Sequence, residues 1–419
     1  MDFLAPSSGI QTITAIISGE KEELQSLKRR GQLAPLETMI TFFQDSDWQT
    51  TMPILMFIIY DSLKERSGRM NRGIIYRTLP VFLEGLSEQE ISGLLNREYT
   101  IKGCPPPLAN EDEYSSDKQC TIQTTPLSWL IYLCTKNRLH ESLSESSCLN
   151  ALSGGYKADI NQPFVFHYTG GGEEDRWTQV SGRSILYAAF AFNKISWAVR
   201  LVREMARFSD NDRYPFFDAF KRSEKKNRFH VVECFWNMLQ QGTVTRERIA
   251  CRDPASDRTD SPFFLMVKDP CISSDDNQYI ITHLMLLGFN PLLTLINWTL
   301  EESNNVGLQP PKAFATITPR ELAVEIHNSI TEYKKQMLMG RLITALQTAE
   351  TLCTQLRGNT VAIYQALTTQ GLPPELQRHI LSGLPYEKYL GNIPKAEAAV
   401  SAVYDRRKKA QSEPVLSTF

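Results

Sequence analysis

The stretch GRSILYAAFAFNKISWAVRLV, residues 182–202, is followed by two others built in the same way, YPFFDAFKRSEKKNRFHVVECFWNML (214–239) and SPFFLMVKDPCISSDDNQYIITHLMLLGFN (261–290). Each contains a small or hydroxyl residue, a short apolar helix, a polar gap and a second apolar helix. A Ser or Thr side chain can cap a helix, and Pro in the first turn loses no intrahelical hydrogen bond. Neither helix of such a pair can bury its apolar stripe alone. The pattern therefore predicts pairs that stack into a solenoid with a concave face.

Two further copies flank these three. Thr124–Leu130 (TTPLSWL) opens one, which closes on Ala158–Asn161 (ADIN), and Thr318–Ala323 (TPRELA) opens the other. The five copies resemble ankyrin repeats, which have a period of about 33 residues and a T-P-L-H-x-A opening. Only the step from Ile185 to Pro215 (215 − 185 = 30) fits that period, so the others require insertions.

The resemblance implies an all-α protein: an ankyrin-type helical-repeat solenoid with insertions, flanked by helical N- and C-terminal segments. An irregular all-helical domain is the alternative. We expect an N-terminal helical domain or solenoid cap at 1–120, degenerate repeats at 121–350, a C-terminal helical module at 351–400 and a flexible basic tail at 401–419. Within the first segment, Ser87 and Glu90 have the spacing of a capping box, which marks a helix start.

Composition restricts the partners and the compartment. The chain has 419 residues, 22% of them charged, and a net charge of −2, so we expect neither nucleic acid nor an anionic membrane as partner. The longest apolar run, Pro53–Tyr60, is far shorter than the ~20 residues of a membrane span. The eight cysteines lack Cys-x-x-Cys spacing, which favours free thiols in a reducing compartment. No secretory signal pattern opens the chain. We expect a cytoplasmic monomer.

A glycine run interrupts the repeats and indicates a contact surface. Gly170–Gly172 lies between Phe164–Tyr168 and Arg176–Val180, and these flanks could form a β-hairpin finger. Aromatic side chains dominate interface hot spots. We therefore predict Tyr168 and Trp177 as exposed anchors for a partner, with a solvated loop as the alternative.

The sequence LPPELQRHILSGL at 372–384 carries the most specific short motif. Leu372, Leu376, Ile380 and Leu384 recur every four residues and form one apolar stripe on a helix. The stretch resembles the start of an F-box, the element that docks onto the Skp-type adaptor of a cullin ubiquitin ligase. The resemblance implies that these four residues bind such an adaptor. A proline-started helix that caps the solenoid is the alternative.

The sequence shows no pattern typical of catalysis or metal binding. No cysteine has a recognisable nucleophile setting, the six histidines form no metal-type cluster, and the glycine run lacks the Lys-Ser/Thr of a phosphate loop. We expect no catalytic residue, cofactor or metal. An unrecognised catalytic domain in the first 120 residues is one alternative.

We expect the chain to bind a partner protein through its solenoid. The pattern resembles the ankyrin effectors that intracellular bacteria deliver into a eukaryotic host. If that resemblance holds, the chain acts in the host cytosol. A further alternative is an adaptor that recruits a host ubiquitin ligase through the F-box-like helix.

Overall fold

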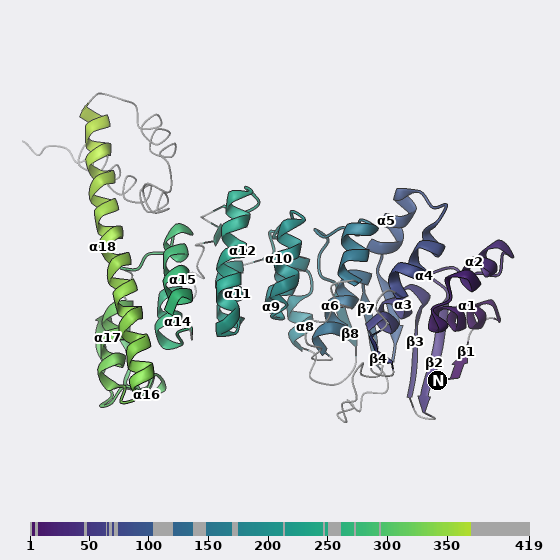
Figure 1. Ribbon diagram of the computed structural model, residues 1–419, viewed down its shortest axis with the longest axis horizontal. Coiled ribbons are helices and arrows are strands. Elements are labelled where there is room, and N and C mark those ends of the chain that lie inside the picture. Colours follow the sequence, from purple (N-terminus) through teal and green to yellow (C-terminus); the bar gives the residue numbers. More distant parts are fainter. Residues whose placement is uncertain are drawn as a thin grey trace, which may run out of the picture. The chain divides into compact units, whose positions relative to one another are not determined.

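The computed structural model describes residues 2–4, 7–45, 48–63, 65–66, 69–70, 74–103, 120–136, 148–169, 175–212, 214–245, 248–249, 261–271, 274–292 and 295–369. The chain divides into two compact units, Met1–Arg213 and Tyr214–Phe419. Figure 1 shows the order of the elements, from the N-terminal strands in purple to the long helix α18 in yellow-green.

The first unit contains an antiparallel sheet. In the part of the unit that the structure describes, six strands lie in the order β1-β2-β3-β6-β7-β8. They are β1 (Asp2–Leu4), β2 (Met39–Asp45), β3 (Trp48–Pro53), β6 (Tyr99–Lys102), β7 (Thr121–Thr124) and β8 (Phe166–Thr169). Each strand pairs antiparallel with its neighbour. A separate two-stranded ladder joins β4 (Glu65–Arg66) to β5 (Arg69–Met70).

The expectation of an all-α ankyrin-type solenoid is wrong, because the fold is mixed α/β. In β2, Ile40 and Phe42 are buried, while the half-buried Thr41 hydroxyl lies 2.8 Å from that of Thr51 on β3. Alternating burial with β-branched and aromatic residues is typical of strands. Strand β3 runs directly into a helix at Ile54, so the strand pattern is short and is followed at once by a helical one.

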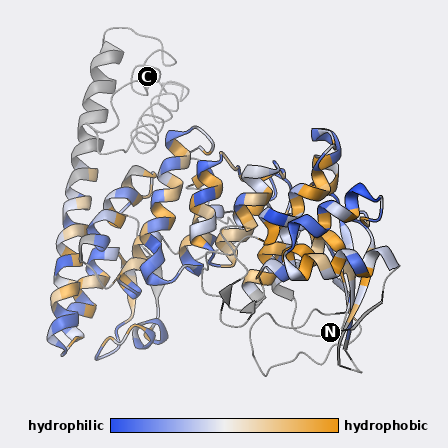
Figure 2. Ribbon diagram, turned by 45° about the vertical axis from the view of Figure 1, so that its right-hand side comes forward, coloured by the Kyte–Doolittle hydropathy of each residue, from blue (hydrophilic) through white to orange (hydrophobic). Residues whose placement is uncertain are grey.

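The core of the first unit is built around α3 (Ile54–Leu63), which is buried along its whole length. It packs against α4 (Ile74–Leu83) and α6 (Pro126–Lys136). The indole Nε1 of Trp129 on α6 donates a hydrogen bond to the Met56 carbonyl at 3.2 Å. Figure 2 shows hydrophobic residues concentrated in the helices beside the sheet.

The described part of the first unit contains further helices. They are α1 (Ser7–Ser18), α2 (Lys21–Arg29), α5 (Glu88–Asn96), the π-helix η1 (Asn150–Gly155), α8 (Asp175–Val180), α9 (Ile185–Ala191) and α10 (Ile195–Arg203). The predicted capping box at the start of α5 is confirmed: the Ser87 hydroxyl accepts from the Glu90 N–H, and the Glu90 carboxylate accepts from the Ser87 N–H.

The second unit is a two-layer stack of helix pairs. The pairs are α11 (Pro215–Arg222) with α12 (Arg228–Gln240), α14 (Pro262–Lys268) with α15 (Ser274–Leu286), and α17 (Pro319–Ser329) with α18 (Tyr333–Thr369). The first helices contact one another in the order α11, α14, α17, and the second helices in the order α12, α15, α18. The 3₁₀-helix η2 (Lys225–Asn227) links the first pair. Helix α16 (Leu300–Asn305) connects β9 (Leu295–Trp298) to its antiparallel partner β10 (Phe314–Ile317).

Local capping chemistry sets the starts of these helices. Pro215, Pro262 and Pro319 each occupy the first turn of a helix. The Ser261 hydroxyl accepts from the Phe263 N–H, and Thr318 forms a capping box with Glu321. These helix starts agree with the sequence pattern, since both capping and the tolerance of Pro are local properties.

A candidate protein-binding cleft in the second unit

Trp177 does not lie on an exposed finger. Only 5% of its surface is accessible, and its ring packs 5.7 Å from that of Phe192 and 5.6 Å from that of Tyr132. The residues around it form helix α8 rather than the second strand of a hairpin. The prediction of Trp177 as an exposed anchor is therefore wrong, because α8 places the indole in the aromatic core.

Tyr168 belongs to the sheet. It lies in β8, opposite Ile122 of β7, and its half-buried side chain packs against Cys120. The β8 ring that contacts Trp177 is Phe166, at 6.4 Å between centroids. Leu372, Leu376, Ile380 and Leu384, the predicted adaptor-binding residues, lie outside the described residues.

A cleft of about 670 Å³ opens in the second unit, between the start of α18, the helix α17 and the loop after α14. Its volume is within the usual range of ligand pockets, about 300–1,000 Å³. Eight of its fourteen lining residues are apolar: Val267, Pro270, Val306, Ile326, Ile330, Met337, Leu338 and Met339. Met337 is 46% exposed, whereas Ile326 and Met339 are buried. We call these apolar lining residues the apolar floor. It combines buried core residues with the exposed side chain of Met337.

The charged part of this lining is mostly basic. Among the residues that the structure describes, five cationic side chains line the cleft, against one carboxylate, that of Asp269. The cations are Lys225, Lys268, Lys334, Lys335 and Arg341. Such an excess is notable in a chain whose net charge is −2.

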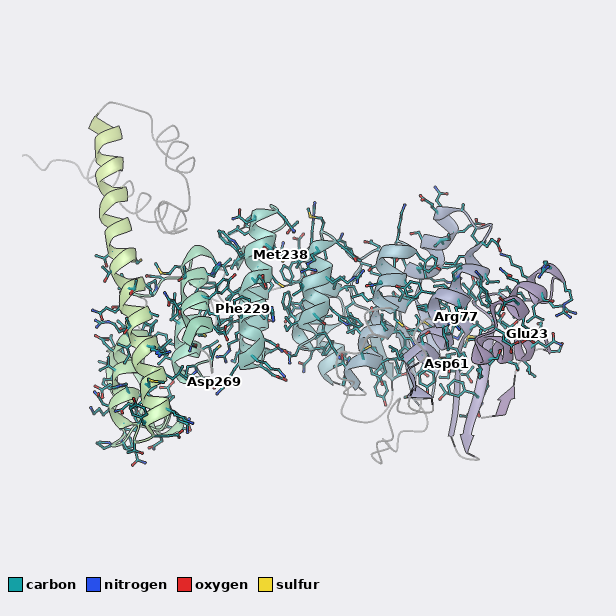
Figure 3. All side chains as sticks on the ribbon, viewed as in Figure 1. Glu23, Asp61, Arg77, Phe229, Met238 and Asp269 are labelled. Atoms are coloured by element: carbon teal, nitrogen blue, oxygen red, sulfur yellow. The ribbon has the colours of Figure 1, made fainter. Side chains whose placement is uncertain are left out.

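The single carboxylate of the lining is already engaged. The Arg228 guanidinium donates to the Asp269 carboxylate at 3.1 Å and also to the Asp269 carbonyl, while Lys225 forms an ion pair with the same carboxylate. The Arg228 side chain is 6% exposed and lies over the ring of Phe220, 5.4 Å from its centroid. Figure 3 shows Asp269 at the end of α14. The arrangement neutralises Asp269 and leaves a net positive wall.

Asn277 fixes the loop that carries this wall. Its Oδ1 accepts from the Cys271 N–H and its Nδ2 donates to the Cys271 carbonyl, both at 2.9 Å. The Cys271 thiol donates to the Lys225 carbonyl at 3.2 Å. Burial raises the pKa of this thiol, so it remains protonated at neutral pH and serves the structure rather than acting as a nucleophile. The cleft is therefore formed before any ligand binds.

Sequence reasoning missed this cleft. Its lysines come from three places that are far apart in the chain, residues 225, 268 and 334–335. Each lysine taken alone resembles an ordinary solvated residue. The one local signal is the pair Lys334-Lys335 in the first turn of a helix, where the helix dipole disfavours cations.

A second surface feature lies on α12 and α15. The rings of Tyr279 and His283 stack at 3.8 Å, Phe229 lies 4.2 Å from Tyr279, and Trp236 meets His283 edge-on at 5.9 Å. The His283 Nδ1 lies 2.9 Å from the Tyr279 carbonyl. Burial lowers the pKa of His283, although the Tyr279 carbonyl and the Glu233 carboxylate act in the opposite direction. The neutral imidazole is thus part of the packing between the two helices.

This packing predicts a loss of stability in acid. The folded pKa of His283 lies below its ordinary value of 6.5, so the unfolded chain binds more protons as pH falls through 6.5. The free energy of unfolding should therefore decrease as pH falls through 6.5 towards the folded pKa. Urea titrations between about pH 7.5 and 5 check this. His283→Gln should flatten the pH dependence, and His167→Gln, on the exposed face of β8, is the control variant. Equal pH slopes in the two variants would contradict the assignment.

The comparisons with known proteins add no relative. No family model, no curated protein and no solved structure matches this chain. Among the residues that the structure describes, no group of three or more His, Cys, Asp or Glu side chains could hold a metal ion. Of the helices in that part of the chain, none has the length and apolar character needed to cross a membrane.

Proposed function

We propose that this chain binds a partner protein, and that the cleft at the start of α18 receives a segment of that partner. The observation that carries the proposal is one cleft whose lining combines apolar side chains with five cationic ones. Buried apolar anchors with a polar rim are the usual anatomy of a recognition site. Because Arg228 and Asn277 already order the loop, binding pays little of the entropy cost of assembling the site.

The position of the cleft also supports this function. Stacked helix pairs hold side chains from several pairs on one surface, and such stacks commonly bind other proteins. Here the first pair supplies Lys225, the second pair supplies Val267, and the third supplies Ile330 and Met337. A partner segment would therefore contact all three helix pairs that the structure describes in this unit.

Substitution of Met337 tests the proposal. Met337→Glu places a carboxylate on the floor, and burying it against a partner's apolar side chain is unfavourable. Met and Glu have similar helix propensity, so the fold should survive. We expect the partner's affinity to fall about 30-fold or more, the cost of losing a hot-spot contact of about 2 kcal/mol.

The measurement is affinity purification from eukaryotic cell extract with the tagged full chain, followed by quantitative mass spectrometry. Leu300→Glu is the matched control, because Leu300 is 54% exposed in the same unit and does not line the cleft. A partner should copurify with the original chain and with Leu300→Glu, but not with Met337→Glu. If all three baits retain the same proteins, the cleft is not the binding site.

A further inference from the structure

We propose that the segment received by the cleft is an acidic peptide of a partner protein, in which carboxylates accompany apolar side chains. This inference rests on the proposed function and adds the chemistry of the partner. Its basis is charge complementarity: five cationic side chains and one neutralised carboxylate surround an apolar floor.

The two lysines that open α18 provide the main attraction. The first turn of α18 contains Lys334 and Lys335 and no acidic residue, although the N-terminal end of a helix favours negative charge. Lys335 forms an exposed ion pair with Glu332 at 2.8 Å. Lys334 has no ion pair in the described part of the chain. Both lysines therefore sit where the helix dipole opposes them, and an incoming carboxylate would pair with Lys334 and complement the helix end together.

The opposite wall keeps its positive charge for a structural reason. Lys225 and Arg228 share Asp269, so two cations face one anion on that side. The carboxylate of Asp269 accepts from both and cannot also cancel the charge across the cleft. An acidic ligand would thus find cations from η2 and from α18 in the same cleft.

The apolar floor favours a peptide with apolar side chains over a simple polyanion as the ligand. Ile330, Met337 and Leu338 are incompletely buried and line the cleft. A free phosphate or a nucleic-acid backbone would leave this surface exposed to water, whereas a peptide with Leu, Ile or Phe between acidic residues would cover it. Carboxylates would set the orientation and the association rate, and the apolar side chains would supply most of the affinity.

Selection of peptides tests this chemistry. Phage-displayed random peptides of about 14 residues, the length of an ordinary protein helix, are selected on the full chain after counter-selection on the double variant Lys334→Glu/Lys335→Glu. Recovered peptides are synthesised and their Kd values are measured by fluorescence anisotropy at low and high salt. We expect peptides of net negative charge with regularly spaced apolar residues, and weaker binding at high salt.

The control variant is Lys221→Glu/Lys226→Glu, which changes the net charge equally on exposed residues that do not line the cleft. The acidic peptides should bind the Lys334→Glu/Lys335→Glu chain at least about tenfold more weakly, and the control chain within about twofold of the original. The charge-reversed chain should also be no less stable, since Glu suits a first helical turn.

Several results would overturn the inference. These are recovery of no peptides, recovery of neutral or basic peptides, equal weakening by both double variants, and displacement by inorganic phosphate at matched ionic strength, which would mark a small-anion site. If Met337→Glu still loses a copurifying protein in these cases, the binding function stands and only the acidic class of partner fails. If Met337→Glu loses nothing either, both proposals fail.

Discussion

Gly103→Ala is expected to destabilise the first unit by about 3 kcal/mol or more, among the largest effects of a single substitution. Gly103 directly follows β6 and has φ +77°, and a Cβ built on it would lie 2.1 Å from the Gln49 carbonyl oxygen of β3. Both the oxygen and the glycine belong to backbone, so neither can rotate away. The β3 backbone must shift, although Thr51 on β3 pairs with Lys102 next to this glycine.

Gly85→Ala is the control that measures the cost of the left-handed backbone conformation without a steric clash. Gly85 has φ +90°, but no atom lies within 4 Å of the position that a Cβ would take there, so this substitution should cost only the left-handed penalty of about 1–2 kcal/mol. Chemical denaturation followed by circular dichroism gives the two free energies of unfolding. Hydrogen exchange at the β3 and β6 amides locates the loss. Equal destabilisation by the two substitutions would show that the β3–β6 approach is looser than described.

Arg228→Met is the substitution with the next largest expected effect, a loss of about 2–3 kcal/mol from the second unit. Removing one member of a buried ion pair costs about 3–5 kcal/mol, and this figure is lowered by the 41% exposure of the Asp269 side chain and by its remaining ion pair with Lys225. The substitution also releases the Asp269 carbonyl, which accepts from Arg228. Methionine fills much of the same space, so lost hydrogen bonds rather than a cavity should dominate.

Lys226→Met is the matched control, because Lys226 is a neighbouring cation on η2 whose side chain is 74% exposed. Its ion pair with Glu224 is on the surface and should contribute less than about 1 kcal/mol. Urea denaturation of the full chains compares them, with hydrogen exchange at the amides of Asp269 and Cys271 as the local readout. If Arg228→Met and Lys226→Met have equal stability, Arg228 does not hold the wall of the cleft.

Much of the second unit was open to prediction from the sequence, and little of the first unit was. The starts of α11, α14 and α17 follow from Pro215, Pro262 and Pro319 with local caps. Strands β6, β7 and β8 are only four residues each and are separated by long intervals. So short a strand carries almost no periodic signal, and its pairing depends on residues far away in the chain.

The candidate site was not predictable at all, for a related reason. Trp177 is of a residue type that is common in interface hot spots, yet in the folded chain its ring packs against Tyr132 and Phe192. The cleft depends on Lys225, Asp269 and Lys334 coming together from three helix pairs. The spacing of these three residues in the sequence does not predict that they line one cleft.

Local sequence was enough to set where the helices of the second unit begin and which of their faces are apolar, since capping and periodicity act within one or two turns of chain. Folding in three dimensions was needed to pair the strands of the first unit, to bury Trp177 and to gather lysines around an apolar floor. The physical reason is range: strand pairing, burial and charge clustering are interactions between residues that lie far apart in the chain and come within a few ångströms only in the folded protein.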